Sequence, residues 1–194
     1  MDKNIYDDLE NRIYLTRAAR ICAAERCKSW SHFLNVLTIW YSISIIVFSI
    51  LNMINTTKPE YISVSLLAFS VIAFGVPVIS NKLNYEERFK KHKHCYIILY
   101  NLYLELAYKQ NKTPQVLNDI QKRYIELLQQ YENHNNFDYI KSIWNNKQQK
   151  IKLCSKIKFV LYSGFVIVIK GILLVLPIVI PCIFEIIMSA LKII

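Results

Sequence analysis

Glycine and proline are scarce in this sequence of 194 residues, which contains three glycines and five prolines. Loops that cradle phosphate groups need closely spaced glycines, so the backbone apparatus for nucleotide binding is largely absent. The sequence also lacks the G-x-S-x-G motif of hydrolases and the H-E-x-x-H motif of zinc proteases. We therefore expect neither a bound cofactor nor enzymatic activity.

Cysteine pairs are missing as well. An odd number of cysteines without a C-x-x-C pair favours reduced thiols that pack in the interior over disulfides or a zinc site. The five are Cys22, Cys27, Cys95, Cys154 and Cys182. The nearest approach to a metal cluster is His92, His94 and Cys95. On a helix His94 points away from the other two, so no metal site is predicted.

Charge is missing from two long stretches. Residues 33–54 and 61–79 contain no charged side chain over 22 and 19 residues, and only residues 55–60 separate them. Each stretch reaches roughly the 30 Å of a bilayer's hydrocarbon core if it is helical. We interpret residues 33–80 as a transmembrane helical hairpin, with a buried pair of helices in a soluble protein as the alternative.

The first span nevertheless carries polar side chains at a regular spacing. Steps of 3, 4, 7 and 3 residues place them on one side of a helix, which we call the polar face. Its members are Asn35, Thr38, Ser42, Ser49 and Asn52. They either pack against a neighbouring helix or line a pore, and an oligomer could satisfy both. In the second span Pro77 predicts a kink, either a gate hinge or a bend.

A third apolar segment, residues 159–187, precedes a short tail at 188–194. It is long enough to span a membrane, yet it contains Lys170, whose insertion at mid-bilayer costs roughly 2.5–3.5 kcal/mol. Either the segment is a kinked third span with Lys170 facing a polar interior, or Lys170 lies at the inner interface and 171–187 insert. The segment is thus predicted to be transmembrane or re-entrant, and Lys170 joins the candidate pore-lining or packing residues.

Basic residues are distributed unevenly around these spans. Residues 1–32 contain six Lys and Arg, the loop at 55–60 one, and residues 81–158 fifteen. The positive-inside rule therefore predicts that the N-terminus and central region face the cytoplasm. The lipid bilayer is the expected partner of this positive charge. Direct nucleic-acid binding is not expected, because the tyrosines do not interleave with the basic residues.

The central region, residues 81–158, predicts cytoplasmic helices. An a/d pattern runs through Tyr85, Phe89, His92, Tyr96, Leu99, Tyr103 and Leu106. Thr113 and Pro114 predict the N-cap and first residue of a second helix, and a third follows from Phe137 to Cys154. We expect a coiled-coil-like bundle, which is either a contact between subunits or a core within one subunit.

The N-terminal region, residues 1–32, predicts one helix with an arginine in its apolar stripe. Arg20 lies in the middle of the face that contains Ile5, Leu9 and Ile13, and Arg17 lies at its edge. An arginine in such a place needs an anionic partner. Both are candidates for contact with lipid headgroups or for gating, with pairing to a carboxylate at Glu86 or Glu87 as the alternative.

Two stretches resemble a known family. RIYLTRAARICAAER (12–26) and, after a short polar linker, WYSISIIVFSIL (40–51) resemble the SLATT domains, which are bacterial two-transmembrane effector domains associated with SMODS nucleotidyltransferases and SLOG sensors. Some versions accompany reverse transcriptases of retron type. The matched pattern covers roughly residues 5–155, and the third apolar segment departs from the two-span core of the family.

Together these features predict an all-α membrane protein with an N-terminal helix, a transmembrane hairpin, cytoplasmic coiled-coil-like helices and a third hydrophobic helix. The resemblance implies an effector of an anti-phage, abortive-infection system, triggered by a nucleotidyltransferase's second messenger or by a reverse transcriptase of a retron. The polar face and the heptads favour a homo-oligomer that forms a pore or disrupts the inner membrane. The alternative is a non-conducting scaffold that recruits a partner through its cytoplasmic helices.

Overall fold

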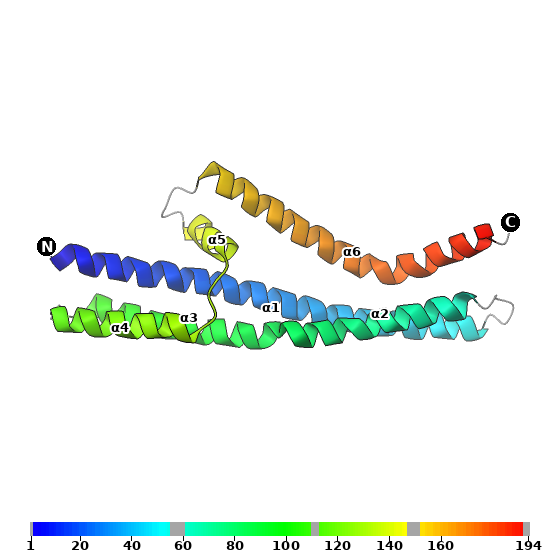
Figure 1. The fold of residues 1–194 in the computed structure, drawn as a ribbon, viewed down its shortest axis with the longest axis horizontal. Helices are drawn as coiled ribbons and strands as arrows, with labels where there is room; N and C mark the ends of the chain where they lie inside the picture. The colour runs from blue at the N-terminus through cyan, green and yellow to red at the C-terminus, as the bar shows by residue number, and fades with distance from the viewer. Residues whose placement is uncertain (1, 55–60, 110–112, 147–151, 192–194) are drawn as a thin grey trace. The chain divides into compact units, whose positions relative to one another are not determined.

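The structure, a computed structural model, describes residues 2–54, 61–109, 113–146 and 152–191 (Figure 1). All the regular structure among these residues is α-helical, which confirms the predicted all-α class. The helices are α1 (Asp2–Ile54), α2 (Tyr61–Leu83), α3 (Tyr85–Tyr108), α4 (Pro114–Gln130), α5 (Asn136–Asn146) and α6 (Leu153–Leu191). The loop of the predicted hairpin, 55–60, and the end of the predicted tail, 192–194, lie outside the described residues.

The N-terminal helix and the first span are one continuous helix. We expected a short polar linker between them, but residues 29–32 are helical and α1 runs for 53 residues. Residues 29–32 are Ser, Trp, Ser and His, so the stretch has no glycine or proline to break the helix. At 1.5 Å per residue, α1 is roughly 80 Å long.

The chain divides into two compact units. We call Met1–Ser29 with Tyr85–Leu161 the helical unit, and Trp30–Asn84 with Tyr162–Ile194 the membrane unit. The chain passes from α2 to α3 at Asn84, whose φ of 47° lies in the left-handed region. Asparagine tolerates this conformation better than most residues, so it suits the break between the two helices.

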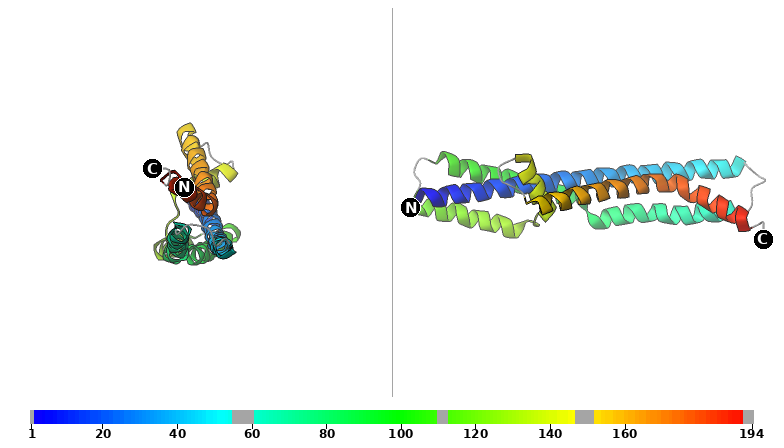
Figure 2. Two further views of the ribbon diagram at one scale, coloured as in Figure 1. Left: turned by 90° about the vertical axis from the view of Figure 1, so that its right-hand side faces the viewer. Right: turned by 90° about the horizontal axis from the view of Figure 1, so that it is seen from above.

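In the helical unit, α3 and α4 pack against each other and against the N-terminal part of α1 (Figure 1; Figure 2, right). The core cluster draws on all three helices; its buried members are Tyr6, Leu9, Ile13, Cys95, Leu99, Leu102, Leu106, Ile120 and Leu127. We expected the third helix of the bundle to lie near residues 137–154, but α1 supplies it instead. With only 11 residues, α5 offers a short apolar face for packing.

The apolar face of α3 differs from the predicted one by a small rotation. His92, Leu99 and Leu106 are buried as expected, whereas Cys95 and Leu102 take the places assigned to Tyr96 and Tyr103. Both tyrosines are half-buried, so their hydroxyl groups stay near the surface of the unit. The predicted start of α4 is confirmed: Thr113 has the extended backbone of an N-cap and Pro114 begins the helix.

Among the residues that the structure describes, three helical stretches are long and apolar enough to cross a membrane, judged by length and composition. They lie within Ile5–Ile54, Leu66–Tyr108 and Leu153–Ile180. This confirms the predicted third hydrophobic helix, α6, which extends over 39 residues despite its glycines and prolines. Figure 1 shows that α6 bends in its C-terminal half, the part that contains Pro177 and Pro181.

The five cysteines are free thiols in two kinds of environment. Cys22, Cys27 and Cys95 are buried in the helical unit, and Cys154 and Cys182 are exposed. Burial raises the pKa of the Cys22 thiol to about 11, and it also raises the pKa of Cys27 and of Cys95. These three thiols are therefore protonated and packed at neutral pH.

Candidate functional site

Arg20 lies inside the helical unit with none of its surface exposed. Its Nη1 is 3.5 Å from Nδ1 of His92 on α3. Burial lowers the pKa of the guanidinium, although it stays above neutral pH as arginine does in proteins. The structure thus places this arginine among side chains of its own chain.

His92 faces Arg20 as a neutral ring. Burial, followed by the positive charge of Arg20, lowers the pKa of His92 to about 4. The neutral ring accepts a hydrogen bond from Arg20 at Nδ1 and must then carry its proton on Nε2. Among the described residues that Nε2 has no hydrogen-bond partner, nor do Nε and Nη2 of Arg20.

Arg17 lies one turn before Arg20 and stacks on an aromatic ring. Its guanidinium carbon is 4.3 Å from the centre of the Tyr100 ring, a cation–π contact. The carboxylates that we considered as partners have other contacts, since Glu86 pairs with Lys90 at 2.8 Å and Glu87 with Lys91 at 2.7 Å. The role of Arg17 in gating or headgroup contact stays a prediction.

A bidentate ion pair attaches α5 to α1. Arg26 donates from Nε and from Nη2 to the two carboxylate oxygens of Asp138, each at 2.9 Å. Asp138 is only 3% exposed and also accepts a bond from the backbone N–H of Asn135. Lys141 and Glu25 add a second pair at 2.8 Å. Both pairs form between the same two helices, so charge contributes to holding α5 against α1.

In the membrane unit, the polar face is largely exposed on the single chain. Asn35, Ser42 and Ser49 are exposed, and Thr38 and Asn52 are half-buried. Thr38 and Ser42 donate to carbonyl groups four residues earlier in α1. The buried positions of this half of α1 are instead Leu34, Leu37, Tyr41 and Ser44. At 100° per residue they centre about 100° around the helix from the polar face.

The buried face of α1 holds α2 and α6 through aromatic side chains. Tyr41 stacks on Phe69 of α2 with ring centres 5.4 Å apart, and each is 1% exposed. The Tyr41 hydroxyl donates to the carbonyl oxygen of Leu173 at 3.1 Å. The Trp40 indole donates to the next carbonyl, that of Leu174, at 2.9 Å.

The bond from Tyr41 follows from Pro177. In an α-helix the carbonyl of residue 173 accepts from the N–H of residue 177, and proline has no N–H. The Leu173 carbonyl is therefore left without its helical donor in an apolar helix, where an unsatisfied polar group costs several kcal/mol. Tyr41 supplies the missing donor. The contact joins α6 to α1 at the position that Pro177 weakens.

Lys170 lies over two aromatic rings of α1. Its Nζ is 4.6 Å from the centre of the Trp30 ring and 5.1 Å from that of Phe33. Trp30 and Phe33 are themselves in edge-to-face contact, with centres 5.8 Å apart. The lysine is thus held at the end of the membrane unit where the first uncharged stretch begins. Pro77 lies within α2, which continues to Leu83; its kink stays a prediction.

A family model described as SMODS and SLOG-associating 2TM effector domain family 5 matches residues 2–183. The chain belongs to this SLATT family. The resemblance predicted from residues 12–26 and 40–51 is confirmed. The match also passes residue 155, where we expected it to end, so most of α6 lies inside the SLATT region. Searches of curated proteins and of solved structures gave no match.

By its family description the chain is a membrane effector, and the apolar helices agree with a membrane location.

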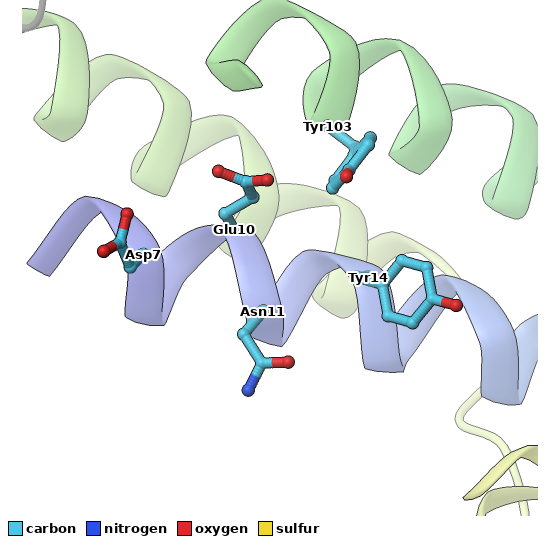
Figure 3. A pocket seen from close by; sticks show the side chains of 5 residues that line it. All are labelled: Asp7, Glu10, Asn11, Tyr14 and Tyr103. Atoms are coloured by element: carbon cyan, nitrogen blue, oxygen red, sulfur yellow. The ribbon is translucent and has the colours of Figure 1, made fainter. Parts of the chain in front are cut away.

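The helical unit also has a shallow acidic cavity of about 290 Å³ (Figure 3). Asp7, Glu10, Asn11 and Tyr14 of α1 and Tyr103 of α3 line it. Desolvation, followed by the Glu10 carboxylate, raises the pKa of Tyr103. Among the described residues, no group of three or more His, Cys, Asp or Glu could hold a metal ion.

Four features of this SLATT chain were not predicted from the sequence. The contact of Arg20 with His92 joins positions 72 residues apart, so no local spacing indicates it. The pairing of Arg26 with Asp138 spans 112 residues. The bond from Tyr41 to Leu173 had a usable signal, because a proline inside an apolar helix requires a donor from a neighbouring helix. The acidic cavity also had a usable sequence signal, which is the spacing that places Asp7, Glu10 and Tyr14 on one helix face.

Proposed function

We propose that this SLATT protein is the membrane effector of a bacterial anti-phage system, and that it oligomerises to form a pore in the inner membrane. The charge distribution supports an orientation with the N-terminus and the helical unit in the cytoplasm. The contact of Lys170 with Trp30 supports an interfacial position for both, because aromatic and long basic side chains gather at headgroup level. Residues 171–187 would then form the inserted part of α6.

The observation that carries the proposal is the exposed polar face. Ser42 and Ser49 are exposed on a helix whose other exposed side chains include Ile39, Ile43 and Ile46. The buried face of α1 is already taken by α2 and α6 through Tyr41. Ser42 donates to the Thr38 carbonyl of its own helix; in a ring of several copies the exposed polar side chains could also contact a neighbouring subunit or line water. A homo-oligomer is therefore the assembly that accommodates them best.

The test compares substitutions of equal shape. Threonine and valine differ only by a hydroxyl and a methyl group, so Ser42→Thr/Ser49→Thr keeps the polarity that Ser42→Val/Ser49→Val removes. Expression of the wild-type chain in growing cells should depolarise the inner membrane, as measured with a potential-sensitive dye. The threonine variant should retain this activity and the valine variant should lose it.

Two results would contradict the pore. One is an unchanged membrane potential in cells that the wild-type chain arrests, which would favour a non-conducting scaffold. The other is equal depolarisation by the threonine and valine variants at matched levels of membrane protein. Ile39→Val/Ile46→Val, on the exposed apolar side of the same helix, is the control for a general effect of valine.

We further propose that the effector responds to a trigger made elsewhere. Its family description names SMODS and SLOG association, which supports a nucleotide second messenger as the trigger. A retron-type reverse transcriptase is the alternative that the sequence resemblance implies. Co-expression with each candidate neighbouring gene, followed by the same potential measurement, tests this. Full toxicity of the chain alone at native expression levels would argue against an external trigger.

A further inference from the structure

The first half of α6, residues 153–169, presents one apolar side to its surroundings. The stretch is helical throughout, and at 100° per residue its large exposed side chains gather on a single side, which we call the α6 apolar face. Each member is more than half exposed; they are Leu153, Ile157, Val160, Leu161, Phe165, Ile167 and Val168. An apolar surface of this extent marks a site of contact with a membrane or with a protein.

The opposite side of the same stretch packs against other side chains of the protein. The ring centre of Phe159 lies 6.0 Å from that of Trp144 on α5. Tyr162 and Val166, which follow Phe159 on this side, are half-buried. The α6 apolar face is therefore the side of the helix that the described part of the chain leaves uncovered.

Three lysines border the α6 apolar face. On the helical wheel Lys152 and Lys156 lie along one edge and Lys158 along the other, and all three are exposed. Among the residues that the structure describes, none of the three pairs with a carboxylate. The sequence gives the reason, since it contains no acidic residue between Asp138 and Glu185. The positive charge at the start of α6 is thus available to an external anion.

The lysines near the start of α3 differ in this respect. Lys90 pairs with Glu86 at 2.8 Å, and Lys91 pairs with Glu87 at 2.7 Å. Both pairs join residues one turn apart on the same helix, so these lysines carry their counter-charge with them. They provide a matched comparison for the unpaired lysines of α6.

We propose that residues 152–169 form an interfacial segment on the cytoplasmic leaflet, with the α6 apolar face against the acyl chains and the three lysines against anionic lipid phosphates. An apolar face flanked by lysines is typical of helices that lie in the membrane interface. Long lysine side chains can reach the phosphates while their stems contact the apolar layer. The inference rests on the proposed function, in which Lys170 lies at headgroup level and 171–187 insert.

The surroundings of the segment favour lipid over a second copy of the chain. Lys156 Nζ lies 5.6 Å from the ring centre of Trp144, which is 43% exposed. Tryptophan and lysine side chains gather together at headgroup level. A second copy would bring further positive charge to the three lysines, because the chain has a net charge of +10. Anionic phospholipid supplies the opposite charge and the acyl chains together.

The depth of two positions tests the segment. Val160 and Val168 both lie on the α6 apolar face, 56% and 57% exposed, and roughly 12 Å apart along the helix axis. The full chain with Cys154→Ser and Cys182→Ser keeps only its three buried thiols. In this background Val160→Cys or Val168→Cys is labelled with a nitrobenzoxadiazole fluorophore in nanodiscs of phosphatidylcholine and phosphatidylglycerol. Lipids that carry a spin label at the headgroup or deep in the acyl chain then report the depth of the fluorophore.

A segment in the interface places both labels at the same shallow depth, so the headgroup spin label should quench both equally and more than the deep one does. Two results would overturn the proposal. If α6 crosses the membrane from residue 159 onwards, the label at Val168 lies roughly 12 Å deeper than the label at Val160. If the segment extends away from the membrane or is covered by protein, neither spin label quenches the fluorophore at Val160.

The role of the lysines is tested by the lipid that surrounds the label at Val160. Spin-labelled phosphatidylglycerol should quench it more than spin-labelled phosphatidylcholine at equal content, and high salt should reduce the difference. Lys156→Gln/Lys158→Gln should lower this preference by about fivefold for each lysine removed. Lys90→Gln/Lys91→Gln removes the same charge from α3 and should leave the preference unchanged.

Equal quenching by the two lipids in the wild-type sequence, or an equal loss in both lysine variants, would contradict binding of anionic lipid by this segment. Neither reading depends on ion conduction. A segment found at the wrong depth would leave the depolarisation test of the pore intact, and a chain that fails to depolarise cells would leave the depth measurement intact.

Discussion

Tyr41→Phe should destabilise the membrane unit through one atom. The substitution keeps the ring that stacks on Phe69 and removes only the hydroxyl that donates to Leu173. Hydrogen bonds between membrane helices contribute about 0.6 kcal/mol on average and up to about 1.7. The carbonyl in question lacks its helical donor because of Pro177, so we expect the upper part of that range, about 1.5 kcal/mol.

The reasoning is tested by restoring the missing donor. Pro177→Ala supplies an N–H at residue 177 that can bond the Leu173 carbonyl within α6. In that background Tyr41→Phe should cost less than about 0.5 kcal/mol, since the carbonyl no longer depends on Tyr41. A double-mutant cycle should therefore give a coupling free energy of about 1 kcal/mol.

Tryptophan fluorescence can follow this cycle during unfolding in mixed dodecyl maltoside and SDS micelles. The chain has three tryptophans, and in a Trp144→Phe background the remaining two, Trp30 and Trp40, both lie in the membrane unit. Ser44→Ala is the control, because its hydroxyl bonds the Trp40 carbonyl, which keeps its own helical donor. Additive costs for Tyr41→Phe and Pro177→Ala, within about 0.3–0.5 kcal/mol, would refute the link between them.

Three further predictions concern charged groups. His92 has its pKa lowered from 6.5 to about 4, so the unfolded chain binds more protons between these values and the helical unit should lose up to about 3 kcal/mol as pH falls through them; His92→Gln should flatten this dependence in thermal melts, and the exposed His94→Gln should keep it. Asp138→Asn should destabilise the helical unit by about 3 kcal/mol because it leaves Arg26 without its carboxylate; protection of the α5 amides from hydrogen exchange should fall, and unchanged protection would contradict the pairing. Lys170→Met and Trp30→Leu should couple by about 1 kcal/mol in the micelle assay if the cation–π contact holds, and additive effects would argue against it.

The membrane segments were predictable because their signal is local. An uncharged stretch of about twenty residues is long enough to cross a bilayer, so the stretches at 33–54 and 61–79 could be predicted as spans from the sequence. The start of α4 could be predicted too, because threonine favours the N-cap position and proline favours the first helical position, as Thr113 and Pro114 do here. The absence of a break at residues 29–32 could have been read from the lack of glycine and proline. Polarity alone wrongly suggested a linker there.

The candidate sites were less predictable because their partners are distant in sequence. The stripe around Arg20 showed that an arginine would meet an apolar environment, but not that a histidine on α3 would face it. Heptad spacing on α3 does not decide which of two adjacent residues is buried when both side chains, such as tyrosine and leucine, are largely apolar. Cys95 and Leu102 are the buried residues, because burying Tyr96 and Tyr103 would also bury their hydroxyl groups.

The distribution of thiols gives this protein its own chemical reporters. Cys22, Cys27 and Cys95 all lie within the helical unit, where their protonated sulfurs should react with alkylating reagents only after the unit opens. Cys154 and Cys182 are exposed, and their labelling from either side of a bilayer should depend on where α6 enters it. Timed alkylation followed by mass spectrometry could therefore separate opening of the helical unit from movement of α6 in one experiment on the unmodified sequence.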